Sequence, residues 1–458
     1  MTELENIPKG WTIAKFEDLL DYIQPTNYIV KSTDYKDTYP TPVLTAGKSF
    51  IKGYTNETEG IFSKLPTIIF DDFTTATQFV NFPFKVKSSA MKILQPTCDL
   101  VNIKLAYYYM QTIHLKGETH KRFWISEYSQ IPVPLAPLNE QKRILAKLEQ
   151  LLTDLYKGIE YLETTKQQLK VYRQAVLKWA FEGKLTRQHH GLSGLKDDTD
   201  NKTTKKKISE IKKSVQISDS DKGELAEGKF NSFINLQKIT TKIGSGATPK
   251  GGESNYKKSG IPLIRSMNIH FNYIEYKGLA YIDETQAKEL DNVIVKENDV
   301  LLNITGASIG RVNIAPNNLA GARVNQHVSI IRLTENYYSK FVKYFLQSPS
   351  VQSWITKENY GVTRQALTKG MIEQMKIPNI SLNEQYHIVS EIESRLSVCD
   401  KIEESIESSL QQAEALRLSI IKKAFEGKLV PQDPDDEPAE KLLQQLRIEN
   451  YELRKKKK

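Results

Sequence analysis

The residues of this sequence best suited to chemistry are polar loop residues of the kind that contact nucleic acid. Arginine and lysine side chains favour guanine, asparagine and glutamine favour adenine, and small polar groups or backbone amides reach phosphate. Three stretches in the second half of the chain, 244–252, 305–311 and 323–327, are rich in such residues. The candidate DNA-binding residues in and near them are Lys250, Arg265, Thr305, Ser308, Arg311, Arg323, Asn325, Gln326 and His327.

The first half of the chain holds a second group of such residues, in the stretches 45–49, 52–55 and 71–78. For any one of them an ordinary surface turn explains the composition equally well, so the prediction depends on the clustering. The candidate DNA-binding residues in this half are Lys48, Ser49, Lys52, Tyr54, Thr74, Thr75 and Gln78.

Motifs for catalysis are present only as fragments. A stretch that ends at Lys48-Ser49 like a phosphate-binding loop has Pro42 in place of the glycine that begins such a loop. A stretch that begins at Gly244 like a dinucleotide-binding fingerprint has Pro249 in place of the third glycine. The paired motifs of adenine methyltransferases, a Gly-rich cofactor loop and Asn-Pro-Pro-aromatic, are not found. We therefore expect no catalytic residue in this chain.

Metal-binding patterns are equally weak. Glu182-x-Lys184 and its repeat Glu426-x-Lys428 resemble half of a nuclease metal site, but both lie where a long helix is predicted to end, which favours a capping role. The two cysteines of the chain are far apart in sequence, which excludes a zinc ribbon or a disulfide framework. We expect no metal-binding residue.

Composition is typical of a cytosolic globular protein. Of the 458 residues 39% are hydrophobic and 26% are charged, and the net charge of +9 permits nucleic-acid binding without requiring it. No apolar run approaches the ~20 residues needed to cross a bilayer, and the acidic N-terminus lacks a signal-peptide pattern. We expect a cytoplasmic protein of two or three domains without a membrane segment.

The element that must position these loops is an internal repeat. Leu138-Asn139-Glu140-Gln141 recurs as 382–385, and the stretch Ala180 to Leu185 recurs as 424–429, both at an offset of 244 residues. Between these anchors each copy has apolar residues at alternating steps of three and four, which predicts one long helix with a coiled-coil seam. Because one such helix would expose its apolar stripe, we expect the two helices to pack as an antiparallel coiled coil with pseudo-twofold symmetry.

The predicted seam, start and end of the helices follow from the same repeat. Ser381 and Glu384 match a capping box at the start of the second helix, and Gly183 and Gly427 fit helix-ending positions. The predicted seam residues are Ile144, Leu148, Leu151, Leu155, Leu162, Leu169, Tyr172, Val176 and Trp179, then Ile388, Ile392, Leu396, Cys399, Ile402, Ile406, Ala413, Leu416 and Ile420.

The remaining segments complete an α+β layout in which two β-rich domains are each followed by a long helix. Strand-like runs such as Thr67 to Phe70 and Val300 to Leu302 lie in the segments ahead of the helices, and the helices match each other while the domains scarcely do. The predicted boundaries are a first domain at 1–136, a helix at 137–185, a flexible linker at 186–229, a second domain at 230–380, a helix at 381–430 and a C-terminal tail at 431–458.

Along nearly its whole length the chain resembles the specificity subunits of type I restriction-modification enzymes. The resemblance rests on the proline-rich lead-ins to the two Leu-Asn-Glu-Gln motifs, on the Phe-Glu-Gly-Lys-Leu helix ends and on the tail 429–439. In the second domain the opening 246–249, the stretch 305–311 and Asn325-Gln326-His327 look like target-recognition motifs. In the first domain, 51–55 and 69–75 look like another class of such domain.

The resemblance implies a division of labour. Each recognition domain would read one half of a bipartite site on double-stranded DNA, and the helices would set the spacer and dock two modification subunits. S-adenosylmethionine would bind to the modification subunits, while ATP and Mg would bind to separate restriction subunits; this chain would hold no cofactor. The residues expected to contact partner subunits are Leu138, Gln141, Phe181, Leu382, Gln385 and Phe425.

Two other functions fit parts of the sequence. A coiled-coil scaffold with two protein-binding β domains explains the helices equally well, but not the polar loops. An enzyme with an unrecognised active site, such as a nuclease, would cleave DNA in the presence of Mg²⁺. Salt-dependent DNA binding distinguishes the first alternative, because phosphate contacts weaken steeply with ionic strength.

Overall fold

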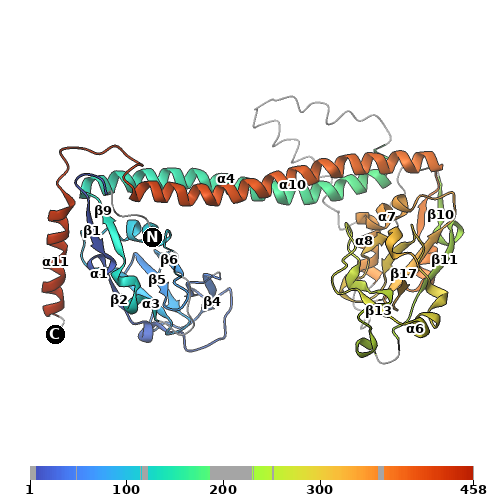
Figure 1. Cartoon of the computed structure of the whole chain (residues 1–458), viewed down its shortest axis with the longest axis horizontal. Coiled ribbons are helices and arrows are strands. Elements are labelled where there is room, and N and C mark those ends of the chain that lie inside the picture. Colours follow the sequence, from blue (N-terminus) through green and yellow to red (C-terminus); the bar gives the residue numbers. More distant parts are fainter. Residues whose placement is uncertain are drawn as a thin grey trace. The chain divides into compact units, whose positions relative to one another are not determined.

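The structure of the chain is a computed structural model, and it describes residues 7–47, 49–113, 115, 122–185, 230, 232–249, 252–358 and 366–456. The predicted linker at 186–229 and the candidates Lys48 and Lys250 lie outside the described residues. The chain divides into two units: unit 1 comprises Met1–Leu162 with Glu407–Lys458, and unit 2 comprises Glu163–Ile406. Each unit therefore combines one globular domain with a part of each long helix (Figure 1).

The globular domain of unit 1 contains three small sheets. The largest is antiparallel, with the order β2-β8-β5-β6, and its strands are β2 (Leu20–Ile23), β8 (Met91–Pro96), β5 (Thr67–Asp71) and β6 (Thr77–Val80). A second has the order β4-β3-β7, with β3 (Thr41–Leu44) antiparallel to β4 (Ile51–Thr55) and parallel to β7 (Lys85–Val86). The third pairs β1 (Thr12–Lys15) with β9 (Pro132–Leu135). Helices α1 (Phe16–Leu19), α2 (Ile103–Met110) and α3 (Phe123–Ser126) share a hydrophobic core with the four-stranded sheet.

Unit 2 also contains a four-stranded, a three-stranded and a two-stranded sheet. The four-stranded sheet has the order β11-β17-β14-β15, formed by β11 (Thr240–Ser245), β17 (Val328–Leu333), β14 (Val300–Asn303) and β15 (Val312–Ile314). In the three-stranded sheet β12 (Ile261–Ile264) is antiparallel to β13 (Ala280–Ile282) and parallel to β16 (Arg323–Val324). Strand β10 (Phe233–Asn235) pairs with β18 (Lys376–Pro378). The helices are α6 (Glu284–Lys288), α7 (Ser339–Gln347), α8 (Pro349–Glu358) and α9 (Lys369–Gln374).

The two globular domains have the same strand topology. The described residues of each unit contain nine strands. Strands β1 to β9 of unit 1 correspond, one by one and in sequence order, to β10 to β18 of unit 2. Corresponding strands occupy the same place in the corresponding sheet. The parallel pair also recurs, as β3 with β7 and β12 with β16. The two domains scarcely match in sequence and nevertheless share this topology, because strand pairing uses backbone groups and tolerates extensive change of side chains.

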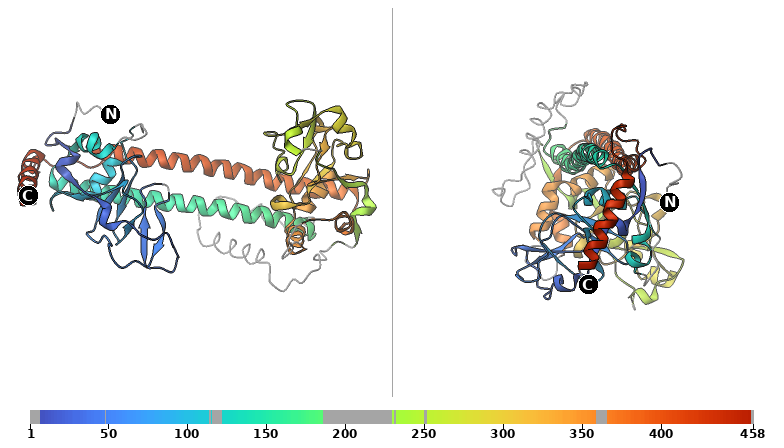
Figure 2. Two further views of the ribbon diagram at one scale, coloured as in Figure 1. Left: turned by 90° about the horizontal axis from the view of Figure 1, so that it is seen from below. Right: turned by 90° about the vertical axis from the view of Figure 1, so that its left-hand side faces the viewer.

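The long helices are α4 (Leu138–Phe181) and α10 (Leu382–Phe425), and their segments pack on each other within each unit. In unit 1, Ile144 and Leu148 of α4 share a core with Ile420 and Ala424 of α10. In unit 2, Arg173 of α4 forms ion pairs with Asp400 (2.7 Å) and Glu403 (3.0 Å) of α10, while Val176 and Phe181 share a core with Ile388 and Ile392. The segments therefore run in opposite directions inside each unit (Figures 1 and 2). A continuous coiled coil with pseudo-twofold symmetry stays a prediction.

The ends of both helices follow the sequence signals. At the start of α10, Glu384 Oε2 accepts a hydrogen bond from the Ser381 amide (3.0 Å) and the Glu384 amide donates to Ser381 Oγ (3.3 Å), which confirms the capping box. Gly183 and Gly427 adopt left-handed conformations, with φ of 67° and 65°. The following amide then donates to a carbonyl in the last turn at 2.9 Å in both copies, from Lys184 to Trp179 and from Lys428 to Lys423. This closure requires glycine.

Two predicted seam residues do not lie in the buried stripe. Ile402 is 40% exposed and Leu416 is 51% exposed, so the prediction is wrong for these positions. A straight helix has 3.6 residues per turn, so a seam that repeats every 3.5 residues drifts around its surface. Leu152 is buried instead, although it lies outside the predicted seam.

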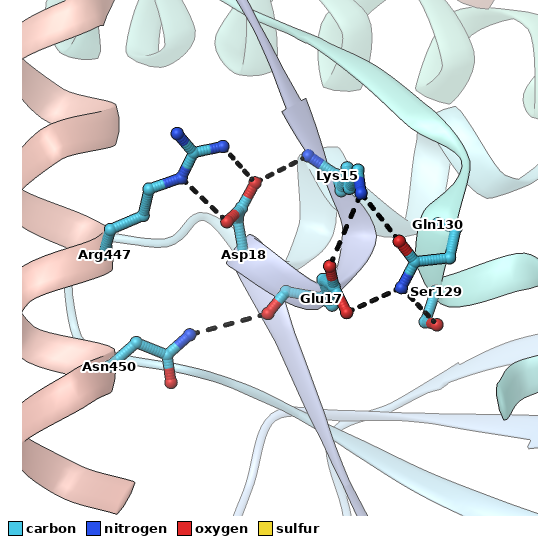
Figure 3. A network of polar contacts seen from close by, with 7 residues as sticks. All are labelled: Lys15, Glu17, Asp18, Ser129, Gln130, Arg447 and Asn450. Carbon is cyan, nitrogen blue, oxygen red and sulfur yellow. Dashed lines mark hydrogen bonds and ion pairs between the residues drawn. The ribbon is translucent and has the colours of Figure 1, made fainter.

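The predicted C-terminal tail contains a helix, α11 (Ala439–Lys456), which packs on the globular domain of unit 1. Ala439, Leu442, Leu443 and Leu446 are buried in the core that contains α1 and α2. Around them, Arg447 hydrogen-bonds Asp18, and the Asn450 amide donates to the Glu17 carbonyl (3.5 Å) (Figure 3). The spacing i, i+3, i+4, i+7 of the four apolar residues is the signal that would have predicted this helix.

Candidate nucleic-acid interface

Three of the six described DNA-binding candidates of unit 1 lie on connections at one edge of its sheets, and the other three lie on strands. Strands β3 and β7 are parallel, so the connections that follow them start side by side. The Lys87 amide, directly after β7, donates to the Leu44 carbonyl at the end of β3 (3.1 Å). The Asp72 amide, directly after β5, donates to the Ala90 carbonyl just before β8 (3.0 Å). We call this set of three connections, β3–β4, β5–β6 and β7–β8, the loop edge of unit 1.

Unit 2 has an equivalent loop edge, formed by 265–279 between β12 and β13, 304–311 between β14 and β15, and 325–327 between β16 and β17. The same two backbone hydrogen bonds recur. The Asn325 amide donates to the Ile264 carbonyl (3.1 Å), and the Ile304 amide donates to the His327 carbonyl (2.9 Å). Two dissimilar sequences therefore bring three equivalent connections together in the same way.

A chain of side-chain contacts links the loop edge of unit 2 to the segment after β11. Thr248 Oγ1 donates to Gln326 Oε1, and Gln326 Nε2 lies 3.1 Å from His327 Nε2. On the other side of the imidazole, Nδ1 contacts Thr305 Oγ1. Both ring nitrogens of His327 are therefore in contact with neighbouring side chains. The contacts hold the exposed Gln326 side chain in a defined position at the surface.

The motif 246–249 begins with Gly246, whose backbone lies very close to the backbone of β16. The Gly246 amide donates to the Asn325 carbonyl (3.2 Å), and a Cβ atom at this position would lie 1.7 Å from the Val324 carbonyl oxygen. Any side chain would push the segment away from β16 and would separate Thr248 from Gln326. The motif glycine is required for this close backbone approach.

The other candidates of unit 2 on the loop edge are half-buried. Ser308 Oγ accepts a hydrogen bond from Asn303 Nδ2 (3.1 Å), and Arg311 ends the same connection. Arg265 begins the β12–β13 connection, where its Nη2 donates to the Gly278 carbonyl (2.8 Å) and its guanidinium lies 5.2 Å from the centre of the Tyr256 ring. The loop edge of unit 2 therefore carries two half-buried arginine side chains.

Two predicted DNA-binding residues, Arg323 and Asn325, are buried in unit 2. Arg323 is 7% exposed; it forms an ion pair with Asp291 (2.7 Å) and donates to the Ala287 and Gly321 carbonyls. Asn325 is 4% exposed, and its Oδ1 accepts a hydrogen bond from the His327 amide (3.0 Å). Both side chains make internal hydrogen bonds that hold the backbone of the loop edge. In this structure neither side chain is exposed for contact with a base.

In unit 1 the loop edge presents Ser49, Thr74 and Thr75. Ser49 and Thr74 are exposed, and Thr75 has a positive φ of 59°, an uncommon conformation for a residue other than glycine. Asp71 Oδ1 stabilises the turn by accepting hydrogen bonds from the Phe73 amide (2.9 Å) and the Thr74 amide (3.0 Å).

The buried Asp72 anchors the same β5–β6 connection. Its Oδ1 accepts a hydrogen bond from the Trp124 amide (2.8 Å), and its Oδ2 lies 3.6 Å from Lys92 Nζ, with both side chains inaccessible to solvent. The Lys92 ammonium also donates to Gln24 Oε1 (3.1 Å). The loop tip is therefore fixed from beneath by a buried ion pair.

The remaining candidates of unit 1 lie on strands that leave this edge. Lys52 is exposed and Tyr54 is half-buried on β4. Gln78 is half-buried on β6, where Thr77 Oγ1 accepts a hydrogen bond from Gln111 Nε2 (2.6 Å). Lys52 and Gln78 are the second residues of their strands and lie next to the edge, whereas Tyr54 lies two residues further along.

Gln141 and Gln385, which were predicted to contact partner subunits, make the same internal hydrogen bond in the two units. Gln141 Nε2 donates to the Ala136 carbonyl (2.8 Å) and Gln385 Nε2 donates to the Ile380 carbonyl (3.2 Å), contacts related by the repeat offset. Gln385 also accepts from the Tyr338 amide (2.9 Å). Both side chains are buried and tie each long helix to the end of the strand before it.

Phe181 and Phe425, from the same set of predicted partner contacts, pack on aromatic rings of the globular domains. The Phe181 ring packs on Phe341 and Phe345 of α7, with ring centres 5.3 Å and 5.5 Å apart. The Phe425 ring packs on Tyr109 of α2 at 4.8 Å. Tyr109 and Phe345 are each the seventh residue of their helix, so the two contacts are equivalent. Leu138 remains at the surface and Leu382 is half-buried.

Other classes of site find little support in the part of the chain that the structure describes. No group of three or more His, Cys, Asp and Glu side chains there could hold a metal ion. Within the same residues, no helix is long and apolar enough to span a bilayer.

One surface feature was missed by the sequence analysis. Residues 266–278 form a small hairpin whose Met267, Phe271, Tyr273 and Tyr276 side chains are all exposed. The signal available in the sequence was the run of ring-bearing residues between two predicted strands.

The comparisons with known proteins identify relatives along most of the chain. Residues 8–170 and 217–412 match the family described as type I restriction modification DNA specificity domain. The specificity subunit of the type I restriction enzyme EcoR124I/EcoR124II from Escherichia coli is 29% identical over 426 residues, which cover 89% of this chain and 91% of that protein. The EcoBI specificity subunit from Escherichia coli is 30% identical over 328 residues, covering 69% of this chain and 64% of that one.

A solved structure shares the fold. A chain from a structural study of complex assembly and conformational transition of the type I R-M system aligns with a TM-score of 0.63 at 15% identity. The alignment covers 92% of this chain and 99% of that chain.

Proposed function

The chain belongs to the type I restriction modification DNA specificity family, and on that premise we propose that each of its two globular domains reads one half of a bipartite DNA site through its loop edge. Its role is sequence specificity, and the family identity makes it a non-catalytic subunit. Base recognition falls to the exposed residues Gln326 and Thr74, with Arg311 and Lys52 placed for phosphate or guanine.

The observation that carries this proposal is the recurrence of one loop edge in both units. The two units share strand order and two backbone hydrogen bonds, while the side chains that they present at this edge differ. A constant frame with variable side chains is the arrangement expected of two modules that read different sequences. A scaffold with two protein-binding domains offers no reason for the repeated edge.

The helices are proposed to set the spacer between the half-sites and to dock two modification subunits. Since Gln141, Gln385, Phe181 and Phe425 are internal, the docking surface is assigned to exposed apolar side chains on the helices. These are Tyr156, Tyr161 and Leu416 in unit 1 and Tyr386, Val398 and Ile402 in unit 2. The modification subunits would bind S-adenosylmethionine and methylate the DNA, and restriction subunits would use ATP and Mg, so this chain needs no cofactor of its own. The subunit would act in the cytoplasm.

The proposal is tested by a long-read methylation map of host DNA with the gene intact and deleted. Loss of one gapped, bipartite motif on deletion is expected. If every methylated motif remains, the chain does not direct methylation in that host, and the scaffold function becomes the better explanation.

A pair of matched variants tests the assignment of the two half-sites. Gln326→Ala should relax or weaken recognition of one half-site by ~1–3 kcal/mol, and Thr74→Ala should act on the other half only. Affinity measured on duplexes with each half altered separately shows which half each variant affects. Equal loss on both halves from either variant would indicate damage to the fold.

A further inference from the structure

The hairpin formed by residues 266–278 in unit 2, the ring hairpin, displays apolar side chains on a rigid backbone. Its two arms meet at a bridge between Ile269 and Ile274, and the His270 amide donates to the Tyr273 carbonyl (3.1 Å) across the turn. The His270 and Tyr273 rings are stacked, with centres 4.5 Å apart and planes at 10°. Tyr273 is 54% exposed and Met267 is 49% exposed.

Three buried amide side chains hold this backbone from beneath. Asn303 Nδ2 donates to the Ser266 carbonyl (2.8 Å), Asn313 Nδ2 to the His270 carbonyl (2.8 Å), and Gln347 Nε2 to the Phe271 carbonyl (2.7 Å). All three side chains are at most 7% exposed. Leaving a buried N–H group without an acceptor is costly, so these three donated hydrogen bonds favour one position of the hairpin.

The ring hairpin continues the loop edge of unit 2. Asn303 bonds both Ser266 in the hairpin and Ser308 in the neighbouring connection, and Gln347 bonds both Phe271 and the Val312 carbonyl, which directly follows Arg311. The charge also suits a polyanion, because Arg265 directly precedes the hairpin, Lys277 lies in its second arm and Glu275 is its single acidic residue. The counterpart in unit 1 is only the short β3–β4 connection.

We propose that the ring hairpin is an apolar DNA-binding surface, which packs Met267, Phe271 and Tyr273 against the duplex beside the bases read by the loop edge. Sugar carbons and thymine methyl groups are the apolar parts of a duplex that such side chains can contact. This inference rests on the proposed function and adds a contact that is independent of phosphate charge.

The test uses the full chain in complex with its modification subunit and a fluorescent duplex that carries the motif from the methylation map. Tyr273→Ser combined with Met267→Ser should lower DNA affinity about tenfold at every salt concentration, the loss equivalent to ~1.4 kcal/mol. The slope of log affinity against log salt should not change, whereas Arg311→Ala should reduce that slope if it contacts phosphate. Tyr273→Phe keeps the ring and should bind as the wild type does.

The matched control is Tyr451→Ser, an exposed tyrosine on α11 outside the loop edges, which should leave DNA affinity unchanged. Wild-type affinity in the double variant would overturn the ring-hairpin inference, and loss on Gln326→Ala in the same assay would leave the proposed function intact. Reduced capture of the modification subunit without DNA would show that the hairpin binds protein instead. An equal loss in Tyr273→Phe would mean that the hydroxyl, not the ring, makes the contact, which also contradicts the inference.

Discussion

Arg447 of α11 holds Asp18 of α1 by two hydrogen bonds, from Nε to Oδ1 (3.0 Å) and from Nη2 to Oδ2 (3.1 Å) (Figure 3). The Lys15 amide donates to the same carboxylate (2.9 Å). Burial opposes ionisation of Asp18, but the hydrogen bonds from Arg447 and Lys15 outweigh it and lower the pKa of Asp18. The last helix of the chain is therefore bound to one of its first elements through a charge that persists at neutral pH.

Arg447→Met should weaken the attachment of α11 to unit 1. Because the Arg447 side chain is 58% exposed, solvent screens the pair, and we expect a loss of ~0.5–1 kcal/mol. Hydrogen exchange of the α11 amides should become faster. Lys441→Met is the control, since its ion pair with Glu437 is exposed on both sides and should contribute little.

The same pair predicts a pH dependence. A lowered pKa means that Asp18 contributes stability above its ordinary value of 3.8, and this contribution is lost as pH falls through the lower pKa of the folded state. The difference in unfolding free energy between wild type and Arg447→Met should therefore shrink in acid. A difference that stays constant below about pH 3 would contradict the assigned ion pair.

Glu140→Gln should stabilise unit 1 at neutral pH. Burial raises the pKa of Glu140 above its ordinary value of 4.5, although a hydrogen bond from Trp11 Nε1 (2.9 Å) opposes the shift. The stability that a raised pKa contributes is lost as the pH rises through the pKa of the folded state. Glutamine carries no charge, so the variant avoids this loss, and its side-chain oxygen can still accept the hydrogen bond from Trp11. Melting temperatures measured from about pH 4 to pH 8 should diverge as pH rises. Parallel curves would refute the prediction. Glu384→Gln should show the opposite trend, because hydrogen bonds from Ser381 lower the pKa of Glu384.

Lys92→Met should strongly destabilise the globular domain of unit 1. It leaves the Asp72 carboxylate buried without its counter-charge, which typically costs ~3–5 kcal/mol. Chemical denaturation of the purified chain measures the loss. Lys36→Met is the matched control, because its ion pair with Asp34 is exposed to solvent and should contribute little to stability. Equal effects of the two variants would argue against the buried pair.

Phe181→Ala and Phe425→Ala should each affect one unit. Phe181 is 6% exposed in the core of unit 2, so its truncation should cost ~3–5 kcal/mol there. Phe425 is half-buried against Tyr109, and its truncation should destabilise unit 1 by less. Hydrogen exchange resolved by peptide locates each effect. Faster exchange in both domains from either single variant would contradict these local roles.

Several features were predictable from the sequence because their signals are local. The 244-residue repeat, the apolar spacing, the Ser381–Glu384 capping box and the terminal glycines specify two helices of matching length. The polar composition of 305–311 and 71–78 indicated loops that the structure places at equivalent edges. Each of these signals depends on residues a few positions apart, within one element.

The use of individual side chains was decided by tertiary structure. Arginine is a residue type that often reads DNA. In the structure, however, Arg323 is buried in an ion pair with Asp291 and in hydrogen bonds to two backbone carbonyls. Gln141 and Gln385 look like motif residues for a partner and instead join helix to strand. Side-chain exposure depends on every element that packs nearby, and no spacing rule along one segment contains that information.

The sequence by itself determined the helices, their caps and the order of the domains, because periodicity and capping act between near neighbours. Only the tertiary structure decided that the two domains share one nine-stranded topology and present the same three connections at one edge. The physical reason is that strands pair through backbone amides and carbonyls across long separations in sequence. Such pairing preserves the strand order while the side chains diverge. The shared strand order is therefore hard to recognise from the sequence.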